Sequence, residues 1–442
     1  MSDVQSACYE TETIDSIDRL APMLRLPVFV TLATLVFGSV GIDVGATSHD
    51  PVRAVGHERL PHVAPESVGM SASRLAAIDE VVRRGIAAGG FPGAAVIVGR
   101  RGGIVWERGY GTLDWQSGIP VDAERTMYDL ASLTKVVATT AGAMVLVDRG
   151  RLRLDEHVAR YLPEFRGGGK ELVTVRDLLM HRSGLPAGRD LARRGGGVES
   201  ARKAVLATAL VNPPGTQEYS DVGMDVMGFV IERITHEPLD QFVQRTVYGP
   251  LGMRSTMFRP SPAVRARIAP TSGLPRGEVH DGDARALGGV AGHAGLFSTA
   301  GDLAVFAQLM LDRGVAGRTR LFADSIAGIF THPEPGWRAL GWLTCPGDGS
   351  CGQYLSSRAF GHTGFTGTSM WIDPDRDLFV VVLTNSVYGR PGGGEAPVAI
   401  VHDVRSDVVD LAAMAIGEGG QYPTPPWRLR SELQNGWSPG GE

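Results

Sequence analysis

Lysine is nearly absent from this chain of 442 residues. Of its 43 basic residues only three are lysines, so arginine stands almost everywhere that a positive charge is needed. Arginine keeps its proton in proteins, whereas a lysine removed from water can lose it. Lys135 lies in an apolar run from Ala131 to Ala138, and Ser132 precedes it by three positions. This S-x-x-K pattern indicates a serine nucleophile activated by a buried lysine.

The surroundings of this motif support that interpretation, although the pattern alone also arises by chance. From Leu130 to Val147 the chain carries no charge except Lys135, which predicts a helix buried on all sides. Residues three apart share one helix face, so Ser132 and Lys135 are expected to point the same way. Burial should lower the pKa of the lysine and supply some neutral amine near pH 7.

Cysteine is equally scarce, and the charges nearly balance. A net charge of −5 without a basic stripe argues against a nucleic-acid partner. Cys345 and Cys351 bracket a turn-rich loop that could close as a disulfide outside the cytoplasm or hold two ordinary thiols. The segment 277–283 and His293 offer some carboxylates and imidazoles but lack the other ligands of a metal site. We therefore expect neither a metal nor a cofactor, and these residues could instead line a substrate groove.

The N-terminus is the part of the chain that looks like a targeting segment. The stretch 26–42 holds 17 uncharged residues, which is short for a membrane-spanning helix and suits the core of a signal peptide. Translation from Met23 would give this core a normal basic start, with small residues for cleavage before Thr47. We predict an exported protein with a leader over residues 1–46, and a retained single membrane anchor as the alternative.

The remainder predicts one domain whose sheet is built from both of its ends. We expect a linker over 47–66, the domain over 67–420 and a disordered Pro/Gly-rich tail over 421–442. Within the domain, a helical subdomain should occupy roughly 135–290, because the predicted strands flank it. The predicted elements are helices over 71–88, 130–147, 174–181, 222–235, 300–313 and about 397–416, strands over 93–99 and 104–106, and a hairpin of 368–373 with 378–383.

Two further segments could complete a site for acyl chemistry. Tyr219 follows a turn-rich stretch just before a helix, and a tyrosine beside a buried lysine can take a proton from a serine hydroxyl. Within 360–367, glycines let a substrate lie against a strand edge, and backbone N–H groups there can face an oxyanion. Taken singly, each segment has a plainer interpretation, namely an ordinary tyrosine at a loop edge and a softened strand with His362 on the surface.

Together, three motifs resemble in order and separation those of the serine β-lactamase and penicillin-binding-protein superfamily. The class C β-lactamase-like branch, with its esterases and D-amino-acid peptidases, is the most similar. The resemblance covers about Ser71 to Met414, with connecting segments at 178–186, 250–253 and 295–302. It implies an α+β fold, with a five-stranded antiparallel sheet flanked by helices beside an all-helical subdomain. The three motifs are Ser132-Leu-Thr-Lys135, Tyr219-Ser-Asp221 and His362-Thr-Gly364.

Carried over by motif, the resemblance also implies roles. Ser132 would be the nucleophile and Lys135 its partner. Tyr219 would be the general base that later returns the proton to the leaving group or activates water. The N–H groups of Ser132 and Phe365 would form the oxyanion hole.

The chain departs from the family pattern at two positions. The usual lysine of the third motif is His362 here, and the usual asparagine of the second is Asp221; with Thr363 and Gly364 these would contact the substrate. A neutral histidine and an added negative charge both weaken the grip on a substrate carboxylate. Efficient β-lactam hydrolysis therefore ranks below ester or amide hydrolysis. Asp221 could instead hold Lys135 charged, which gives that lysine an electrostatic role.

These observations predict an exported serine hydrolase that forms an acyl-enzyme on an ester or amide, esterase-like in character. The alternatives are a D-alanyl-D-alanine carboxypeptidase, a peptidoglycan amidase or a weak class C β-lactamase, and, outside the enzymes, an inactive scaffold that binds cell-wall peptides. The expected partner is a small ester or amide or a cell-wall peptide. An α/β-hydrolase is not expected, because the G-x-S-x-G of residues 436–440 lies in the tail without a strand and helix around it.

Overall fold

The computed structural model describes residues 59–417 except 337, 346–348 and 390–397. The leader 1–46 and the tail 421–442 therefore lie outside the described residues, as do the G-x-S-x-G segment and most of the linker. The described residues all belong to one unit, 54–442. None of the helices described in it is both long and apolar enough to cross a membrane.

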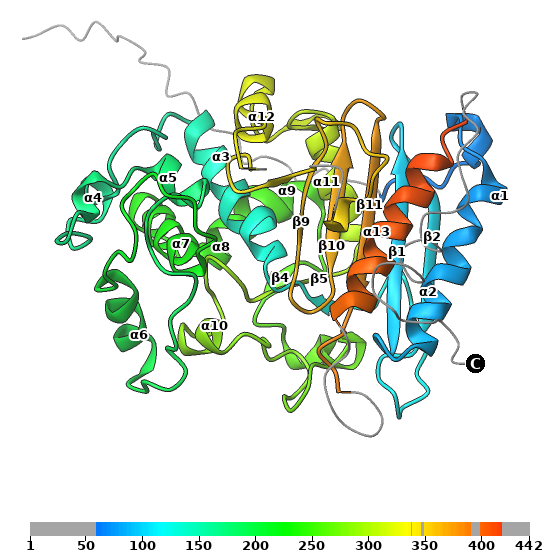
Figure 1. The fold of residues 1–442 in the computed structure, drawn as a ribbon, viewed down its shortest axis with the longest axis horizontal. Helices are drawn as coiled ribbons and strands as arrows, with labels where there is room; N and C mark the ends of the chain where they lie inside the picture. Colours follow the sequence, from blue (N-terminus) through cyan, green and yellow to red (C-terminus); the bar gives the residue numbers. More distant parts are fainter. Residues whose placement is uncertain (1–58, 337, 346–348, 390–397, 418–442) are drawn as a thin grey trace, which may run out of the picture. The chain divides into compact units, whose positions relative to one another are not determined.

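An antiparallel sheet of six strands organises this unit (Figure 1). The spatial order is β2-β1-β11-β10-β9-β8, so strands from the two ends of the domain pair with each other at its centre, as predicted. The sheet has one strand more than the five expected, because the short edge strand β8 pairs with β9. The strands are β1 Gly93–Arg100, β2 Gly103–Gly111, β8 Leu343–Thr344, β9 Phe360–Thr363, β10 Ser369–Asp373 and β11 Leu378–Thr384.

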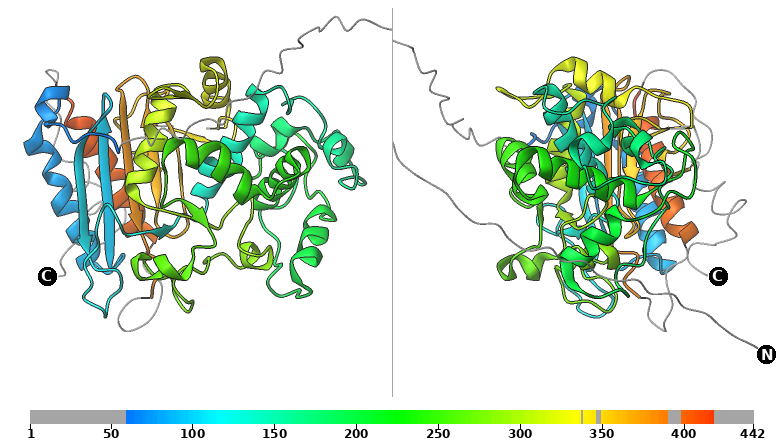
Figure 2. Two further views of the ribbon diagram at one scale, coloured as in Figure 1. Left: turned by 180° about the vertical axis from the view of Figure 1, so that it is seen from behind. Right: turned by 90° about the vertical axis from the view of Figure 1, so that its left-hand side faces the viewer.

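Both faces of the sheet are buried, and its central strands are mostly apolar. In β1, Ala95 and Ile97 pack into one core, while Val96 and Val98 pack into another on the opposite side. Figure 1 shows α1 Ala72–Leu75, α2 Ala77–Ala87 and α13 Val398–Met414 over one face of the sheet. Figure 2 gives the opposite view, with α11 Ala300–Leu311 over the other face.

The remaining helices lie mostly between β2 and β8 in sequence. The predicted helix over 130–147 consists of a π-helix, η2, that continues directly into α3. π-helical segments are rare in proteins, and many of those that do occur lie at functional sites. The helices are η1 Pro65–Val68, η2 Lys135–Thr140, α3 Ala141–Asp148, α4 Val158–Tyr161, η3 Lys170–Leu172, α5 Val175–Leu179, α6 Gly197–Leu206, α7 Asp221–Thr235, α8 Leu239–Val243, η4 Gln244–Tyr248, α9 Gly249–Leu251, η5 Pro262–Arg267, α10 Gly282–Ala286, α12 Asp324–Thr331 and η6 Gly349–Cys351.

Local sequence signals account for several of these bounds. Thr174 and Asp177 form a reciprocal capping box at the start of α5, and the side chains of Ser220 and Thr299 cap α7 and α11. The predicted hairpin is confirmed as β10 and β11. Two small sheets complete the fold, formed by β3 Tyr128–Asp129, β5 Leu296–Ser298 and β4 Met257–Phe258 in that order, and by β6 Val315–Ala316 with β7 Thr319–Arg320.

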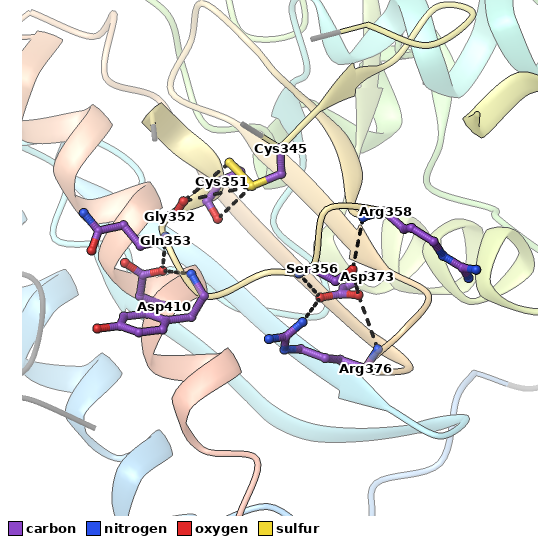
Figure 3. Close-up of a disulfide and its surroundings, with 10 residues drawn as sticks. Cys345, Cys351, Gly352, Gln353, Ser356, Arg358, Asp373, Arg376 and Asp410 are labelled. Atoms are coloured by element: carbon purple, nitrogen blue, oxygen red, sulfur yellow. Dashed lines mark hydrogen bonds and ion pairs between the residues drawn. A yellow bond between two sulfur atoms is a disulfide. The ribbon is translucent and has the colours of Figure 1, made fainter. Parts of the chain in front are cut away.

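A disulfide joins Cys345 to Cys351 in the connection between β8 and β9 (Figure 3). Two residues further on, the N–H of Gln353 donates to the carboxylate of Asp410 on α13 at 2.6 Å. The carboxylate of Asp373, at the end of β10, holds a later turn of the same segment through two hydrogen bonds. The connection is thus attached both to the sheet and to the helix that covers it.

The packing of β1 on β11 gives a test of the fold. Gly99 faces Phe379 across the strand pair, and a Cβ at Gly99 would lie 2.0 Å from the phenyl ring. We expect Gly99→Ala to lower the free energy of unfolding by about 1–3 kcal/mol, because the ring must move within a packed core. In a Phe379→Leu background the loss of stability caused by Gly99→Ala should be smaller. Chemical denaturation of the wild type, the two single variants and the double variant measures this loss in both backgrounds. Equal costs in both backgrounds would place the strain elsewhere.

Candidate active site

Ser132 lies in a turn immediately before the buried helix formed by η2 and α3. The preceding residue, Ala131, has a φ of 46°, which is uncommon for a residue with a side chain. Its N–H donates to the buried carboxylate of Asp129 at 2.9 Å, and the same carboxylate accepts the N–H of His280 at 2.7 Å. Burial raises the pKa of Asp129 to about 6. This carboxylate holds the turn in a conformation that presents the serine.

Lys135 is fully buried, and oxygens surround its Nζ. Nζ lies 2.9 Å from Ser132 Oγ, forms an ion pair with Asp221 Oδ1 at 2.6 Å, and donates to the main-chain oxygen of His293 at 3.2 Å. Burial by itself lowers the pKa of Lys135, but Tyr219 and Asp221 favour the charged form and together raise the pKa above its ordinary value. The expectation of a lowered lysine pKa is therefore wrong, and a charged Lys135 held by Asp221 fits the structure.

Tyr219 precedes α7, and its hydroxyl lies 3.0 Å from Ser132 Oγ. Its ring centroid is 4.6 Å from that of His181 and 5.2 Å from the guanidinium carbon of Arg338. Burial, followed by the charges of Arg338 and Lys135, lowers the pKa of His181 well below its ordinary value, so this imidazole is a neutral neighbour. Tyr219 is thus held by packing on its ring while its hydroxyl faces the serine.

The third motif is attached directly to the nucleophile turn. The hydroxyl of Thr366 donates to the main-chain oxygen of Asp129 at 2.7 Å, and that of Thr368 donates to Leu130 O at 3.0 Å. A Cβ at Gly364 would lie 2.4 Å from Leu130 O, which explains the glycine of this motif. The two segments that would form the oxyanion hole are therefore fixed to each other, although they are far apart in sequence.

The N–H groups of Ser132 and Phe365 donate to no other group in the described part of the chain. The ring of Phe365 is 71% exposed and stacks on that of His280 at 6.0 Å. Both N–H groups are thus available to the oxygen of a substrate carbonyl. Their role as an oxyanion hole stays a prediction, and His280 touches a residue of the pocket described below.

His362 is buried at the end of β9, where its Nδ1 lies 2.7 Å from Thr363 O. Its Nε2 has no hydrogen-bond partner among the residues described. Burial, followed by the positive charges of Lys135 and Arg338, lowers the pKa of His362 to about 3. The imidazole is therefore neutral at physiological pH, and it does not replace the charge of the lysine usual in this motif.

Six of the eight predicted residues line one pocket of about 390 Å³. The other two, Lys135 and Asp221, are not among its described lining residues, because they form an ion pair behind the serine. Two lining cations, Arg338 and Arg405, were missed, since nothing in the sequence distinguishes them from the other arginines. Arg405 donates to the carbonyls of residues 364 and 367 at 2.5 and 3.0 Å, and burial lowers its pKa to about 9. The lining residues are Ser132, Tyr219, Arg338, Leu343, His362, Thr363, Gly364, Phe365, Ser386, Val387, Val401 and Arg405.

His293, which was considered as a metal ligand, contacts two carboxylates. Nδ1 of His293 lies 2.7 Å from Asp225 Oδ1, and Nε2 lies 2.9 Å from Asp281 Oδ1. Burial opposes the charged form, but the two carboxylates raise the pKa of His293 well above its ordinary value. Asp283 accepts main-chain N–H groups from the loop 189–191. Both ring nitrogens are thus engaged by carboxylates, and the charged ring fixes the main-chain oxygen that receives Lys135.

Comparisons with known proteins agree with this geometry. The sequence model of the family described as Beta-lactamase matches residues 78–404. An N-acetylmuramyl-L-alanine amidase of Bacillus subtilis (strain 168) is 34% identical over 367 residues, which cover 72% of this chain and 82% of that protein. A protein of Salmonella agona (strain SL483) named "Putative D-alanyl-D-alanine carboxypeptidase" is 34% identical over 378 residues, covering 75% of this chain and 87% of its own.

Solved structures show the same α+β fold, which confirms the predicted fold class. A penicillin-binding protein homolog from Caulobacter crescentus aligns with a TM-score of 0.64 and 21% identity, covering 78% of this chain and 99% of that one. A family VIII carboxylesterase aligns with a TM-score of 0.63 and 22% identity over the same shares. The family match spans most of the chain and includes all three motifs. The chain therefore belongs to the beta-lactamase family, in its class C-like branch, and is a hydrolase of that family.

Proposed function

We propose that this hydrolase forms an acyl-enzyme at Ser132 on an ester or amide substrate. The observation that carries the proposal is the position of Ser132 Oγ, 2.9 Å from Lys135 Nζ and 3.0 Å from the Tyr219 hydroxyl, at the wall of a pocket. A serine oxygen between a cation and a proton acceptor needs only a carbonyl in that pocket to react. An inactive scaffold would not require these three groups to stay within hydrogen-bond distance, so the geometry favours catalysis.

Acylation follows from these contacts. The oxygen of Tyr219, acting as the general base, accepts the proton of Ser132 while Oγ attacks the substrate carbonyl carbon. The ammonium of Lys135 stabilises the negative charge that passes between the two oxygens, and the N–H groups of Ser132 and Phe365 donate to the carbonyl oxygen as it becomes an oxyanion. Tyr219 then gives its proton to the departing alcohol or amine, and the acyl group stays on the serine.

Deacylation runs through the same groups. A water molecule takes the place of the leaving group, and Tyr219 accepts one of its protons as the water oxygen attacks the acyl carbon. The tetrahedral intermediate collapses, Ser132 departs with the proton returned by Tyr219, and the carboxylic acid leaves. Lys135 keeps its charge throughout, in agreement with its raised pKa.

The bond that is cleaved is the finer part of the proposal. An ester is the first candidate, as the motif departures suggest. An amide within a cell-wall peptide is the second, and it is supported by the names of the two relatives, an amidase and a "Putative D-alanyl-D-alanine carboxypeptidase". Penicillin hydrolysis ranks below both, because the neutral His362 lacks the charge with which the third motif helps hold the β-lactam carboxylate.

Export belongs to the same proposal. The uncharged stretch 26–42 supports it, as does the disulfide between Cys345 and Cys351, since disulfides persist mainly outside the cytoplasm.

The nucleophile assignment is tested with a short-chain p-nitrophenyl ester. The wild type should release nitrophenol in a pre-steady-state burst, because acylation precedes hydrolysis of the acyl-enzyme. Ser132→Ala should lower kcat by at least about 1,000-fold. A fluorophosphonate should add one adduct to the wild type and none to this variant in intact-protein mass spectrometry. The exposed Ser200 on α6 supplies the matched control, Ser200→Ala, which should retain both properties. An unchanged rate in Ser132→Ala contradicts the assignment.

The charge of Lys135 is tested by removing its counter-ion. Asp221→Asn restores the family's usual residue and takes away a charge that raises the lysine pKa, so that pKa should fall. If Lys135 acts as an ammonium, the alkaline limb of the kcat/KM profile must move to lower pH. If neutral Lys135 were the base, activity near pH 7 would rise instead, which would contradict the mechanism above. Asp155→Asn, at a side chain that is 79% exposed, is the control and should leave the profile in place.

A further inference from the structure

Arg338 is the charged group in the pocket that the mechanism does not use. It lies between Glu334 and Leu343 in the chain and forms main-chain bridges with both. Its guanidinium carbon lies 5.2 Å from the centroid of the Tyr219 ring, and the residue lines the same pocket as Ser132. The guanidinium therefore borders the space in which a substrate carbonyl must meet the nucleophile.

This guanidinium has an unsatisfied donor. Nη1 of Arg338 is buried and has no hydrogen-bond partner among the described residues, and no ion pair reaches the group there. Burial lowers the pKa of Arg338, yet an arginine keeps its proton in proteins. A buried charged donor without an acceptor is costly, so such groups normally have a partner. The contact with the Tyr219 ring supplies only the face of an aromatic group and leaves the N–H edge free.

The charged side chains described near Arg338 do not supply an acceptor for its Nη1. Glu334 bridges to Arg338 through the main chain only, and its carboxylate pairs with Arg182 at 3.1 Å and Arg176 at 3.6 Å. Among the described residues that line the pocket there is no aspartate or glutamate. The second lining cation, Arg405, already donates from Nε and Nη2 to main-chain oxygens of the third-motif loop. Among the described residues no acceptor for Nη1 of Arg338 remains, so a bound molecule can supply one.

We propose that Arg338 binds a carboxylate of the substrate, so that this hydrolase selects acyl compounds with a negative charge close to the bond that is cleaved. The inference rests on the proposed function, because it assigns the substrate of that same pocket. One guanidinium with a free N–H edge matches the single charge and flat shape of a carboxylate. The site differs from the charge of the third motif, since His362 is neutral and Arg338 stands outside all three motifs.

The shape of the pocket fits such a molecule. Beside the arginines it offers the hydroxyls of Thr363 and Ser386 and the apolar side chains of Leu343, Val387 and Val401, in a volume of about 390 Å³. A short chain with a carbonyl at one end and a carboxylate at the other can lie along the apolar residues, with its carbonyl at Ser132 and its charge at Arg338.

The test compares two substrates that differ only in charge. Mono-4-nitrophenyl adipate carries a free carboxylate, and methyl 4-nitrophenyl adipate replaces it by a neutral ester of similar length. The wild type should prefer the anion by at least about tenfold in kcat/KM. In Arg338→Gln that preference should fall by about 10- to 100-fold, mainly through KM, because a hydrogen bond to a charged group is lost. Arg338→Lys should keep part of the preference, because the positive charge remains but the paired N–H donors of the planar guanidinium are lost.

Charge reversal and a matched control sharpen the result. Arg338→Glu should favour the 4-nitrophenyl ester of 6-aminohexanoic acid over the adipate anion, which reverses the order of the wild type. Arg193→Gln, at a side chain that is 88% exposed, should leave the preference unchanged. Fluorophosphonate labelling of Ser132 and thermal unfolding show that each variant is folded and retains its nucleophile.

The outcomes separate the inference from the function on which it rests. A wild type that shows a burst with both esters but no preference for the anion overturns the carboxylate site and leaves the acyl-enzyme standing. An equal fall in kcat/KM for both substrates in Arg338→Gln also overturns the carboxylate site, because Arg338 would then act only by packing on Tyr219. Absence of any burst or fluorophosphonate adduct in the wild type would remove the acyl-enzyme itself.

Discussion

The buried ammonium of Lys135 is the constraint on which the rest of the active site depends. An ammonium has three N–H donors, and the oxygens around it include Ser132 Oγ at 2.9 Å, Asp221 Oδ1 at 2.6 Å and His293 O at 3.2 Å. Because water does not reach this charge, the chain itself must supply its acceptors. The nucleophile turn, the start of α7 and the loop before β5 are thus held in place by one ion.

The carbonyl that receives Lys135 depends in turn on a second buried charge, the imidazole of His293. The carbonyl of His293 can face Lys135 only while its loop keeps its position, and the charged imidazole anchors the loop to Asp225 at 2.7 Å. Asp225 lies about one helical turn after Asp221 on α7, so the helix that supplies the counter-ion of the lysine also fixes the carbonyl. At Gly292 the loop comes so close that a Cβ would lie 1.9 Å from a main-chain oxygen of α7. Glycine is required there because nothing larger leaves room for this approach.

Features that depend on neighbours in the chain could be predicted from the sequence. Helical spacing brought Ser132 and Lys135 together, and two strand-like runs on either side of the turn 374–377 located β10 and β11. The balance of opposing effects could not be predicted: burial lowers the pKa of Lys135, whereas Tyr219 and Asp221 raise it, and the outcome depends on how close these two groups lie to Nζ. Arg338 could not be identified either, because its significance is the absence of a partner in three dimensions. The strand β8 has two residues, too few to show any periodicity.

These constraints separate the catalytic charge from the charge that faces the substrate. Lys135 is balanced by Asp221 behind the serine, and burial keeps His362 neutral at the strand edge. The positive charge of the pocket therefore comes from Arg405, which donates to the third-motif loop, and from Arg338, whose Nη1 has no hydrogen-bond partner among the described residues. On our proposal, substrate charge is recognised at a residue whose replacement leaves the oxygens around Lys135 in place. In this chain the substrate preference can therefore change at a position outside the three motifs without moving the catalytic groups.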